Sequence, residues 1–310
     1  MIEAVEVSKY YGARRALADV SFSIQQGEVV GFLGLNGAGK TTVLKVLCGL
    51  LVPSSGQVTV DGVDGIEAPR ELRKRIGFLQ DRPPLFPEMT VHQMVAYAAR
   101  LCGLPAERVD RRVAEVLELC GVADVADDLI EWLSHGYRQR VGIAIAVAHE
   151  PKLVVLDEPI SGLDPAQIVA MRGLIRGLKE KHTVLISSHI LSEISHTCDR
   201  ILVLHQGRIV AQGTEATLAS GVSPLVEIVA RGQLADVAKA DLAHQEGVAE
   251  LEAADVGEGL VRLRARLASD AARELLVATL VQRGFGVRTV ADTEVGLESV
   301  FLKLTKGAEA

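Results

Sequence analysis

The sequence predicts an α/β protein built on a parallel β-sheet, followed by a smaller α+β domain. Apolar strands at 152–158 and 182–188 alternate with helical segments, as the buried strands of a parallel sheet do. Alternating apolar and polar residues at 2–7 and 20–24 indicate an antiparallel sheet at the edge of the first domain. After about residue 220 the order of elements becomes β-α-β-β-α-β, which predicts a separate small domain.

The elements of the first domain follow from local patterns. An apolar strand at 28–34 runs directly into glycines, and a helix is expected from Lys40 to about Leu50. A turn at 53–56 precedes another strand, and residues from about 85 to 140 have a helical pattern that predicts a helical subdomain. Asp164 followed by Pro165 predicts the start of a helix that reaches about Lys181. A helix at 191–199 and a hairpin at 200–213 complete this part.

The change of pattern near Ala219 divides the chain into an expected first domain of 1–219 and a second of 220–310. In the second, strands are expected at 224–230, 248–254, 260–267 and 287–293, with helices at 234–244 and 270–284. That order predicts a ferredoxin-like sandwich. A last helix is expected at 296–307.

Composition limits the possible partners. The 310 residues carry a formal net charge of −7, which argues against a general nucleic-acid binder because that function needs a basic face. No apolar run reaches the roughly 18 residues of a membrane span, and the N-terminus lacks the apolar core of a secretory signal. The four scattered cysteines form no metal-ligand spacing and are expected to be buried or semi-buried thiols in a reducing compartment. A soluble chain is therefore expected, and any membrane role requires a partner.

The strongest local motif is the segment 34–42, which fits the pattern G-x-x-x-x-G-K-[ST] between a predicted strand and a predicted helix. Glycines allow backbone N–H groups to turn toward phosphates, and the helix N-terminus favours their negative charge. Lys40 supplies a cation for the phosphates, and the hydroxyl of Thr41 is a Mg²⁺ ligand. The expected nucleotide-binding residues are Gly34, Asn36, Gly37, Ala38, Gly39, Lys40, Thr41 and Thr42.

The strand at 152–158 ends in two acids. Asp157 at the end of a buried strand predicts a carboxylate that holds Mg²⁺. Glu158 projects differently and can polarise an attacking water. Together with the glycine-rich segment, this pair predicts a nucleotide-hydrolysing enzyme.

Two further segments narrow the class. Leu133–Arg140 reads LSHGYRQR before a helix, and Ser161–Asp164 reads SGLD shortly after LDEP. With these motifs in this order, residues 1–218 resemble the ATPase subunits of ABC transporters. The resemblance implies ATP and Mg²⁺ as ligands, and it implies that Tyr11 stacks on adenine, although an isolated tyrosine on an edge strand is often only structural. It also implies that Ser134 and Gly136 reach the γ-phosphate held by the opposite subunit, that Asp164 lies at the dimer seam and that His189 contacts the γ-phosphate.

The chain departs from the family pattern at two places. The common LSGGQ is LSHGY here, so His135 and Tyr137 replace Gly and Gln while the serine and second glycine remain. In the Q-loop the register places Asp81 at the usual glutamine position and Gln80 one residue earlier. Either Asp81 makes the metal and water contacts, or the loop shifts. These departures resemble the gliding-motility and nitrous-oxide-reductase-maturation type of exporter ATPase, which pairs with a separate permease of the type 2 exporter class.

The resemblance implies a head-to-tail dimer that ATP closes. The expected assembly is a homodimer, and a heterodimer is the open alternative. It is expected to bind a membrane permease at the cytoplasmic face of the cell membrane. The alternative is an ABC ATPase without a transporter, acting on ribosomes or DNA. A single cassette, and fewer than a hundred residues between the phosphate loop and the LSHGY segment, argue against that alternative. For the second domain, a regulatory role and a packing role are both open.

Overall fold

The computed structural model describes residues 1–219, 225–233, 236–237 and 242–293. The chain divides into two compact units, Met1–Thr214 and Glu215–Ala310. Each unit has its own hydrophobic core, and each is described by itself below.

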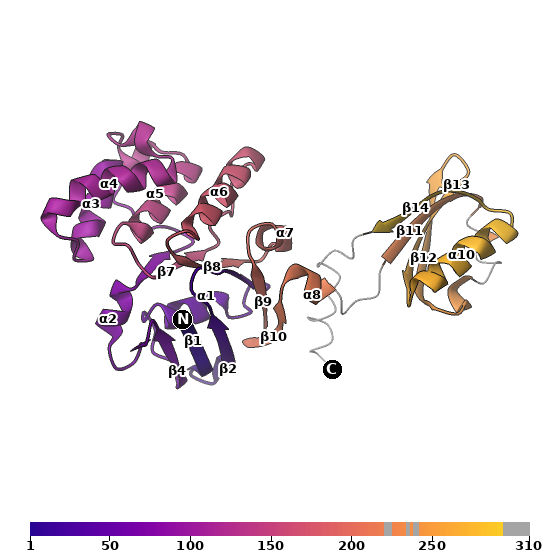
Figure 1. Cartoon of the computed structure of the whole chain (residues 1–310), viewed down its shortest axis with the longest axis horizontal. Coiled ribbons are helices and arrows are strands. Elements are labelled where there is room, and N and C mark those ends of the chain that lie inside the picture. The colour runs from indigo at the N-terminus through magenta and orange to yellow at the C-terminus, as the bar shows by residue number, and fades with distance from the viewer. Residues whose placement is uncertain (220–224, 234–235, 238–241, 294–310) are drawn as a thin grey trace. The chain divides into compact units, whose positions relative to one another are not determined.

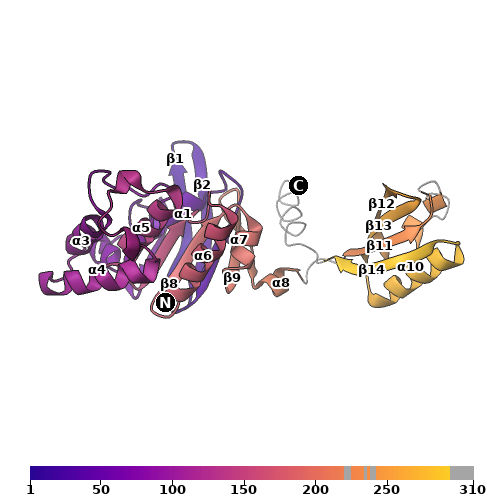
Figure 2. The same ribbon diagram turned by 90° about the horizontal axis from the view of Figure 1, so that it is seen from above.

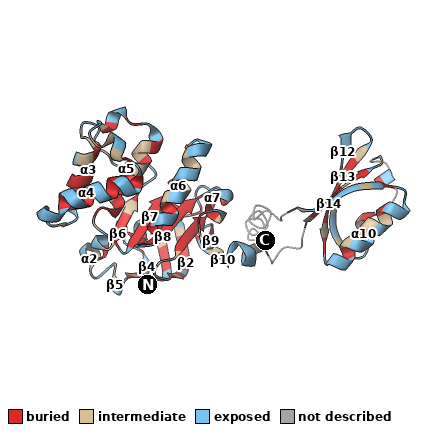
Figure 3. Cartoon of the chain, turned by 45° about the horizontal axis from the view of Figure 1, so that its top comes forward, coloured by how far each residue is buried: buried red, intermediate tan, exposed pale blue. Residues whose placement is uncertain are grey.

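The centre of the first unit is a six-stranded sheet in the order β10-β9-β3-β8-β7-β6 (Figure 1). The five strands β9 to β6 pair in parallel, and β10 pairs antiparallel with β9. All residues of β3, β7 and β8 are buried, which explains why most of their side chains are apolar. The strands β7 and β8 are coloured as buried in Figure 3. The predicted α/β class with a parallel sheet is confirmed. The strands are β3 (Val29–Leu33), β6 (Ile76–Leu79), β7 (Leu153–Asp157), β8 (Thr183–Ser188), β9 (Arg200–His205) and β10 (Arg208–Gly213).

A second, antiparallel sheet in the order β2-β1-β4-β5 forms the edge of this unit. The long hairpin of β1 (Ile2–Tyr11) and β2 (Arg14–Ile24) pairs with β4 (Ser55–Val60), which pairs with the short β5 (Val63–Asp64). Helix α1 (Lys40–Leu47) contacts β2 and β4 of this sheet and β7 of the other. Leu44 and Leu47 of α1 are therefore fully enclosed between two sheets.

Helices α3 (Val91–Leu101), α4 (Ala106–Cys120) and α5 (His135–Val147) form the helical part. They contact one another, and two short 3₁₀ turns, Ala123–Val125 and Ile130–Trp132, join α4 to α5. Helices α6 (Pro165–Leu178) and α7 (Leu191–Ser195) pack against β8 (Figure 2). Helix α2 (Pro69–Lys74) precedes β6, and α8 (Glu215–Ala219) begins the second unit.

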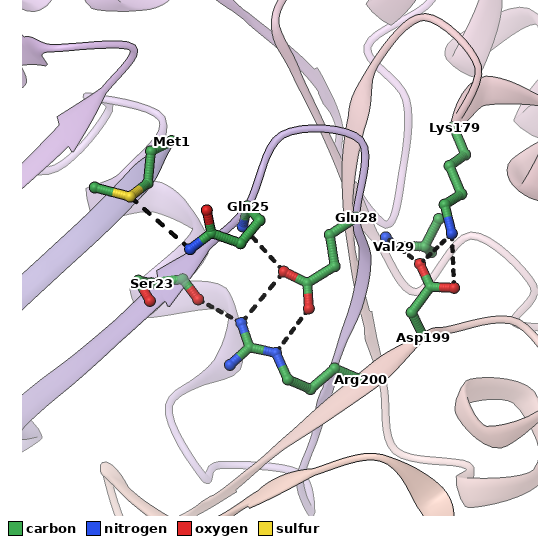
Figure 4. Close-up of polar contacts among 8 residues, drawn as sticks. All are labelled: Met1, Ser23, Gln25, Glu28, Val29, Lys179, Asp199 and Arg200. Carbon is green, nitrogen blue, oxygen red and sulfur yellow. Dashed lines mark hydrogen bonds and ion pairs between the residues drawn. The ribbon is translucent and has the colours of Figure 1, made fainter.

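Charged groups join the starts of β3 and β9 (Figure 4). Arg200 donates to Glu28 Oε1 at 2.8 Å and to the carbonyl oxygen of Ser23. Asp199 accepts from the amide of Val29 at 2.9 Å and from Lys179 Nζ at 2.8 Å. These contacts align two neighbouring parallel strands at their amino ends, so the carboxyl ends of both strands meet at the opposite edge.

The second unit contains a four-stranded sheet in the order β12-β13-β11-β14, antiparallel throughout. Leucines of β13 and of helix α10 (Asp270–Gln282) meet in its core. The strands are β11 (Leu225–Arg231), β12 (Val248–Gly257), β13 (Leu260–Leu267) and β14 (Gly286–Thr293). Of the expected helix at 234–244, the described residues include a 3₁₀ turn at Leu242–His244. The expected helix at 296–307 lies outside the described residues.

Candidate active site

The loop between β3 and α1 wraps around an open space at the carboxyl end of the sheet. Gly37 and Gly39 have φ values of 84° and 109°, a backbone region that side-chain-bearing residues rarely adopt. A Cβ on Gly34 would lie 2.6 Å from the carbonyl oxygen of Leu204, and one on Gly39 would lie 2.9 Å from that of Ala16. Gly39 is the N-cap residue of α1 and makes no side-chain hydrogen bond to the helix. The first amides of α1 therefore have no side-chain acceptor from the cap and can donate to a group in this space.

Glu158 lies between two cationic or potentially cationic groups. Its Oε1 is 3.3 Å from Lys40 Nζ, and its Oε2 is 2.9 Å from Nδ1 of His189. Lys40 also donates to the carbonyl oxygen of Gly34 at 2.7 Å. The backbone of Glu158 has a φ of 51°, and its amide donates to the carbonyl oxygen of Ser187 at 3.1 Å. This turn directs the carboxylate away from the strand axis and into the open space.

Asp157 is held by two hydroxyl groups. Thr41 Oγ1 donates to its Oδ2 at 3.1 Å, and Ser187 Oγ donates to its Oδ1. Burial raises the pKa of Asp157, and the nearby charges of Glu158 and Asp81 raise it further, while the two hydroxyl hydrogen bonds oppose this. A buried carboxylate among other carboxylates favours a bound cation.

A cavity of about 920 Å³ contains these groups. Most of the residues expected from the sequence line it: Tyr11, Asn36, Gly37, Gly39, Lys40, Thr41, Thr42, Asp81, Asp157, Glu158 and His189. Six expected residues are absent from the lining: Gly34, Ala38, Gln80, Ser134, Gly136 and Asp164. Of these, Gly34 and Ala38 belong to the loop itself.

Asp81 and Gln80 differ in position. Asp81 lines the cavity and Gln80 does not, although both are exposed. The carbonyl oxygen of Asp81 accepts from Nε2 of the buried Gln139 on α5 at 3.1 Å. That hydrogen bond fixes the backbone of the loop after β6 to the helical part.

The LSHGY turn, residues 133–137, lies outside the cavity of its own chain. Ser134 caps α5, where its Oγ accepts from the amide of Tyr137 at 3.4 Å. A Cβ on Gly136 would lie 2.7 Å from Oε1 of Gln167, so the turn packs against the start of α6. Asp164 caps α6 by accepting from the amide of Gln167 at 2.9 Å. These residues therefore stand together at the starts of two neighbouring helices.

The structure adds residues that the sequence analysis did not identify. Gln206 and Gly207 line the cavity, and the amide of Gly207 donates to the carbonyl oxygen of Ala38 at 2.8 Å. The sequence predicts that Gln206 and Gly207 form the turn of a hairpin, but it does not predict that this turn packs against the glycine-rich loop between β3 and α1. Ser187 is a hydroxyl at a strand end, a signal that could have indicated it as a partner for Asp157. The other additional lining residues are Arg14, Arg15, Ala16, Leu35 and Ser161.

Several known proteins are similar to this chain in sequence. A family model described as "ABC transporter" matches residues 17–161. The chain is 32% identical over 309 residues to the bacitracin transport ATP-binding protein BcrA of Bacillus licheniformis, across 99% of this chain and 98% of the relative. It is 41% identical over 221 residues to the methionine import ATP-binding protein MetN of Caulobacter vibrioides, across 69% of this chain and 67% of the relative.

A solved structure is similar as well. It is the dimeric structure of a post-hydrolysis state of an ATP-binding cassette bound to ADP and Pi. Its TM-score is 0.63 at 26% sequence identity, and the match covers 69% of this chain and 98% of that one. Within the part of the chain that the structure describes, no helix is long and apolar enough to cross a bilayer.

Proposed function

Because this chain belongs to the ABC transporter family as an ATP-binding subunit, we propose that its first domain, 1–219, forms a head-to-tail homodimer that closes on two ATP molecules and drives an exporter permease. Members of this family hydrolyse ATP and work with a membrane-embedded partner. The observation that carries ATP hydrolysis at this site is the position of Glu158, with one carboxylate oxygen 3.3 Å from Lys40 and the other 2.9 Å from His189.

Each of these three groups has a separate role in hydrolysis. Lys40 is a point charge for the β- and γ-phosphates. Glu158 polarises the attacking water, and His189 orients Glu158 and contacts the γ-phosphate. The contact between Lys40 and Glu158 is an ion pair, so the same lysine charge serves both the phosphates and the carboxylate that faces the attacking water.

Magnesium fits the oxygen groups beside this site. Mg²⁺ takes few protein ligands and keeps phosphate oxygens and waters, so one hydroxyl and one carboxylate are a sufficient protein contribution. Thr41 Oγ1 and Asp157 Oδ2, already within 3.1 Å of each other, would hold it. The ion supplies charge neutralisation to the phosphates when bound. Asp81 rather than Gln80 is the Q-loop group that we assign to the metal and its waters, because Asp81 lines the cavity.

The head-to-tail dimer accounts for groups that do not reach their own cavity. Ser134, Gly136 and Asp164 lie outside the lining, at the starts of α5 and α6. Converting a dimer from 1:99 to 99:1 requires about 5.5 kcal/mol. Two γ-phosphates, each bound by one or two hydrogen bonds of about 1.5–3 kcal/mol to a charged group, supply that amount. Ser134 and the amide of Gly136 are the donors that we assign to the partner's nucleotide.

Export rather than import is supported by how far the relatives match. The bacitracin transport relative matches 99% of this chain, including the second unit, whereas the methionine import relative matches 69%. The LSHGYRQR segment agrees with the gliding-motility and nitrous-oxide-reductase-maturation type, and we assign the chain to that group and to the inner face of the cell membrane. Co-purification with a permease, followed by a transport assay in vesicles, tests the direction. Uptake from the face opposite the ATPase would refute export.

We assign residues 220–310 to an accessory domain of ferredoxin-like topology. The strand order β12-β13-β11-β14 and the antiparallel pairing support this assignment. Among the described residues of this domain, none lines the cavity or belongs to the groups assigned to hydrolysis. We therefore assign it to regulation or to stabilisation of the dimer rather than to catalysis.

The decisive experiment replaces Glu158 by Gln. We expect ATP hydrolysis to fall at least about 100-fold, because the amide cannot accept a proton from water. ATP-dependent dimers should accumulate and be detected by size-exclusion chromatography with ATP and Mg²⁺. Glu180→Gln, at an exposed position outside the cavity, serves as the matched control. Normal hydrolysis by the Glu158 variant would refute the proposal.

A further inference from the structure

His135 replaces a glycine of the family pattern, and the structure gives its ring a partner. Its Nε2 lies 3.0 Å from the carbonyl oxygen of Ser161. A carbonyl oxygen can only accept, so Nε2 carries the hydrogen and donates. Ser161 belongs to the SGLD turn, 26 residues further along the chain. The imidazole thus joins the LSHGY turn to the SGLD turn of the same chain, a contact that glycine cannot make.

Side chains also pack closely against glycines of the two turns. Gly162 has a φ of 75°, and a Cβ there would lie 3.4 Å from Nε2 of His135. One residue past His135, a Cβ on Gly136 would approach Oε1 of Gln167 to 2.7 Å. The hydrogen bond of His135 therefore lies within a close contact between the first turns of α5 and α6, and the ring is held against the SGLD turn.

Tyr137, the second residue that departs from the family pattern, contacts a different part of the chain. The hydroxyl of Tyr137 donates to Asp124 Oδ2 at 2.9 Å. Asp124 lies in the 3₁₀ turn after α4, within the helical part. Of the two unusual residues, His135 alone contacts the turn that borders the nucleotide cavity.

Ser161 lines that cavity and is also tied to Glu158. Its amide donates to the carbonyl oxygen of Glu158 at 3.2 Å, while its own carbonyl accepts from His135. Two hydrogen bonds therefore separate Glu158 from the side chain of His135. A movement of the SGLD turn, on binding or loss of the γ-phosphate, would be transmitted to the LSHGY turn through this contact.

We propose that His135 is a positioning residue that fixes the LSHGY turn to the SGLD turn of its own chain. Ser134 and Gly136, which are assigned to the partner's nucleotide, are then held in place by the SGLD turn, which borders the chain's own nucleotide cavity. This inference rests on the head-to-tail dimer proposed above. It adds a residue that couples the two nucleotide sites of that dimer. His135 acts through Ser134 and Gly136, and it is assigned no contact with nucleotide.

The test compares full-length His135→Leu, His135→Gln and wild-type protein. In the leucine variant we expect kcat for ATP hydrolysis to fall about 3- to 10-fold, the effect of one lost hydrogen bond on closure. The Hill coefficient for ATP should fall toward 1, because the sites no longer communicate. ADP binding should stay within about twofold, because the chain's own cavity keeps its lining. His135→Gln should restore kcat and cooperativity, since its amide nitrogen reaches the same carbonyl.

The matched control is His196→Leu. His196 is also exposed, and its Nδ1 contacts a backbone carbonyl oxygen, that of Ser192, at 2.8 Å, but this contact stays at the end of α7. Wild-type kinetics are expected. His135→Ala provides the same comparison if the leucine variant does not fold.

Three results would overturn the inference: unchanged kcat and cooperativity in His135→Leu, failure of glutamine to restore them, or a loss of ADP affinity as large as the loss of kcat. Each is distinct from failure of the proposed function, which normal hydrolysis by Glu158→Gln would reveal.

Discussion

At the scale of single residues, the site keeps charges in place before any ligand binds. Asp157, which is 3% exposed, is buried with only hydroxyl hydrogen donors on its side-chain oxygens, whereas Glu158 has Lys40 and His189. A carboxylate without a cationic partner is costly to bury. Burial of Asp157 therefore carries an electrostatic cost that a bound cation would offset.

This cost predicts opposite effects of Asp157→Asn on stability and on activity. At neutral pH the variant should have a higher Tm than the wild type without nucleotide, yet hydrolyse ATP at least about 100-fold more slowly. The raised pKa means that the folded state binds the proton of Asp157 more tightly than the unfolded state does. The contribution of Asp157 to stability is thus present at low pH and is lost as the pH rises through the raised pKa.

Thermal unfolding of both proteins from about pH 4 to 7 measures this effect. The difference in Tm should shrink as the pH falls. Asp127→Asn, at an exposed position, is the control and should change Tm little at any pH. A wild type that is more stable than Asp157→Asn at neutral pH would contradict the prediction.

At the scale of elements, the helical part depends on one buried cation. Arg112 of α4 has a side chain that is 7% exposed, and it donates to the carbonyl oxygens of Ala148 at 3.2 Å and Val147 at 2.9 Å. Those carbonyls lie at the C-terminus of α5, where no later turn of the helix can supply donors, and that of Val147 also accepts from the amide of Glu150 at 3.1 Å. Arg112 therefore ties α4 to the C-terminus of the helix that begins at the LSHGY turn.

Arg112→Met should lower the free energy of unfolding by about 1–3 kcal/mol, because the carbonyl of Ala148 loses its donor from Arg112 and that of Val147 loses one of two donors. Arg111→Met is a control on the next residue. Its guanidinium is 74% exposed and contacts only Glu115 at 3.6 Å, so its loss should cost less than about 0.5 kcal/mol. Urea denaturation of both variants measures the difference. Equal stability of the two variants would show that Arg112 does not support α5.

Short elements mark the limit of pattern-based prediction. The helix expected from Lys40 to about Leu50 ends at Leu47, with Gly49 at a φ of 63° just beyond it. Elements β5, α2 and β6 contain six residues or fewer. A segment of that length shows less than two helical turns or three alternations, so its periodicity cannot be distinguished from chance. The 15-residue α4, with its strong helical pattern, was predictable. The five-residue β7 was predictable for another reason: its run is apolar throughout and ends in two acids.

At the scale of the whole molecule, the two units have separate cores. The buried cluster around Phe32 and Leu44 contains only residues of the first unit, and the cluster around Leu263 and Leu276 only residues of the second. The cavity is lined by residues between Tyr11 and Gly207. We therefore expect binding and hydrolysis of ATP to depend on the first unit.

A chain ending at residue 219 should fold and bind ADP within about twofold of the full-length protein. Its basal ATP hydrolysis should persist. Isothermal titration calorimetry and a phosphate-release assay measure both properties against the full chain. A loss of ADP affinity beyond about tenfold would show that the second unit contributes to the nucleotide site.

The sequence by itself determined the α/β class and the family, because the phosphate loop, the LDE strand end and the LSHGY and SGLD turns are contiguous motifs whose chemistry is local. It could not determine which distant groups meet. The strand order places β3 between β8 and β9, which brings Lys40, Glu158 and His189 together across up to 149 positions. The contact of His135 with Ser161 and the packing of Gly207 on Ala38 likewise arise from neighbouring elements that lie far apart along the chain. Only the tertiary structure decides such contacts, since they depend on topology and packing rather than on any pattern along the chain.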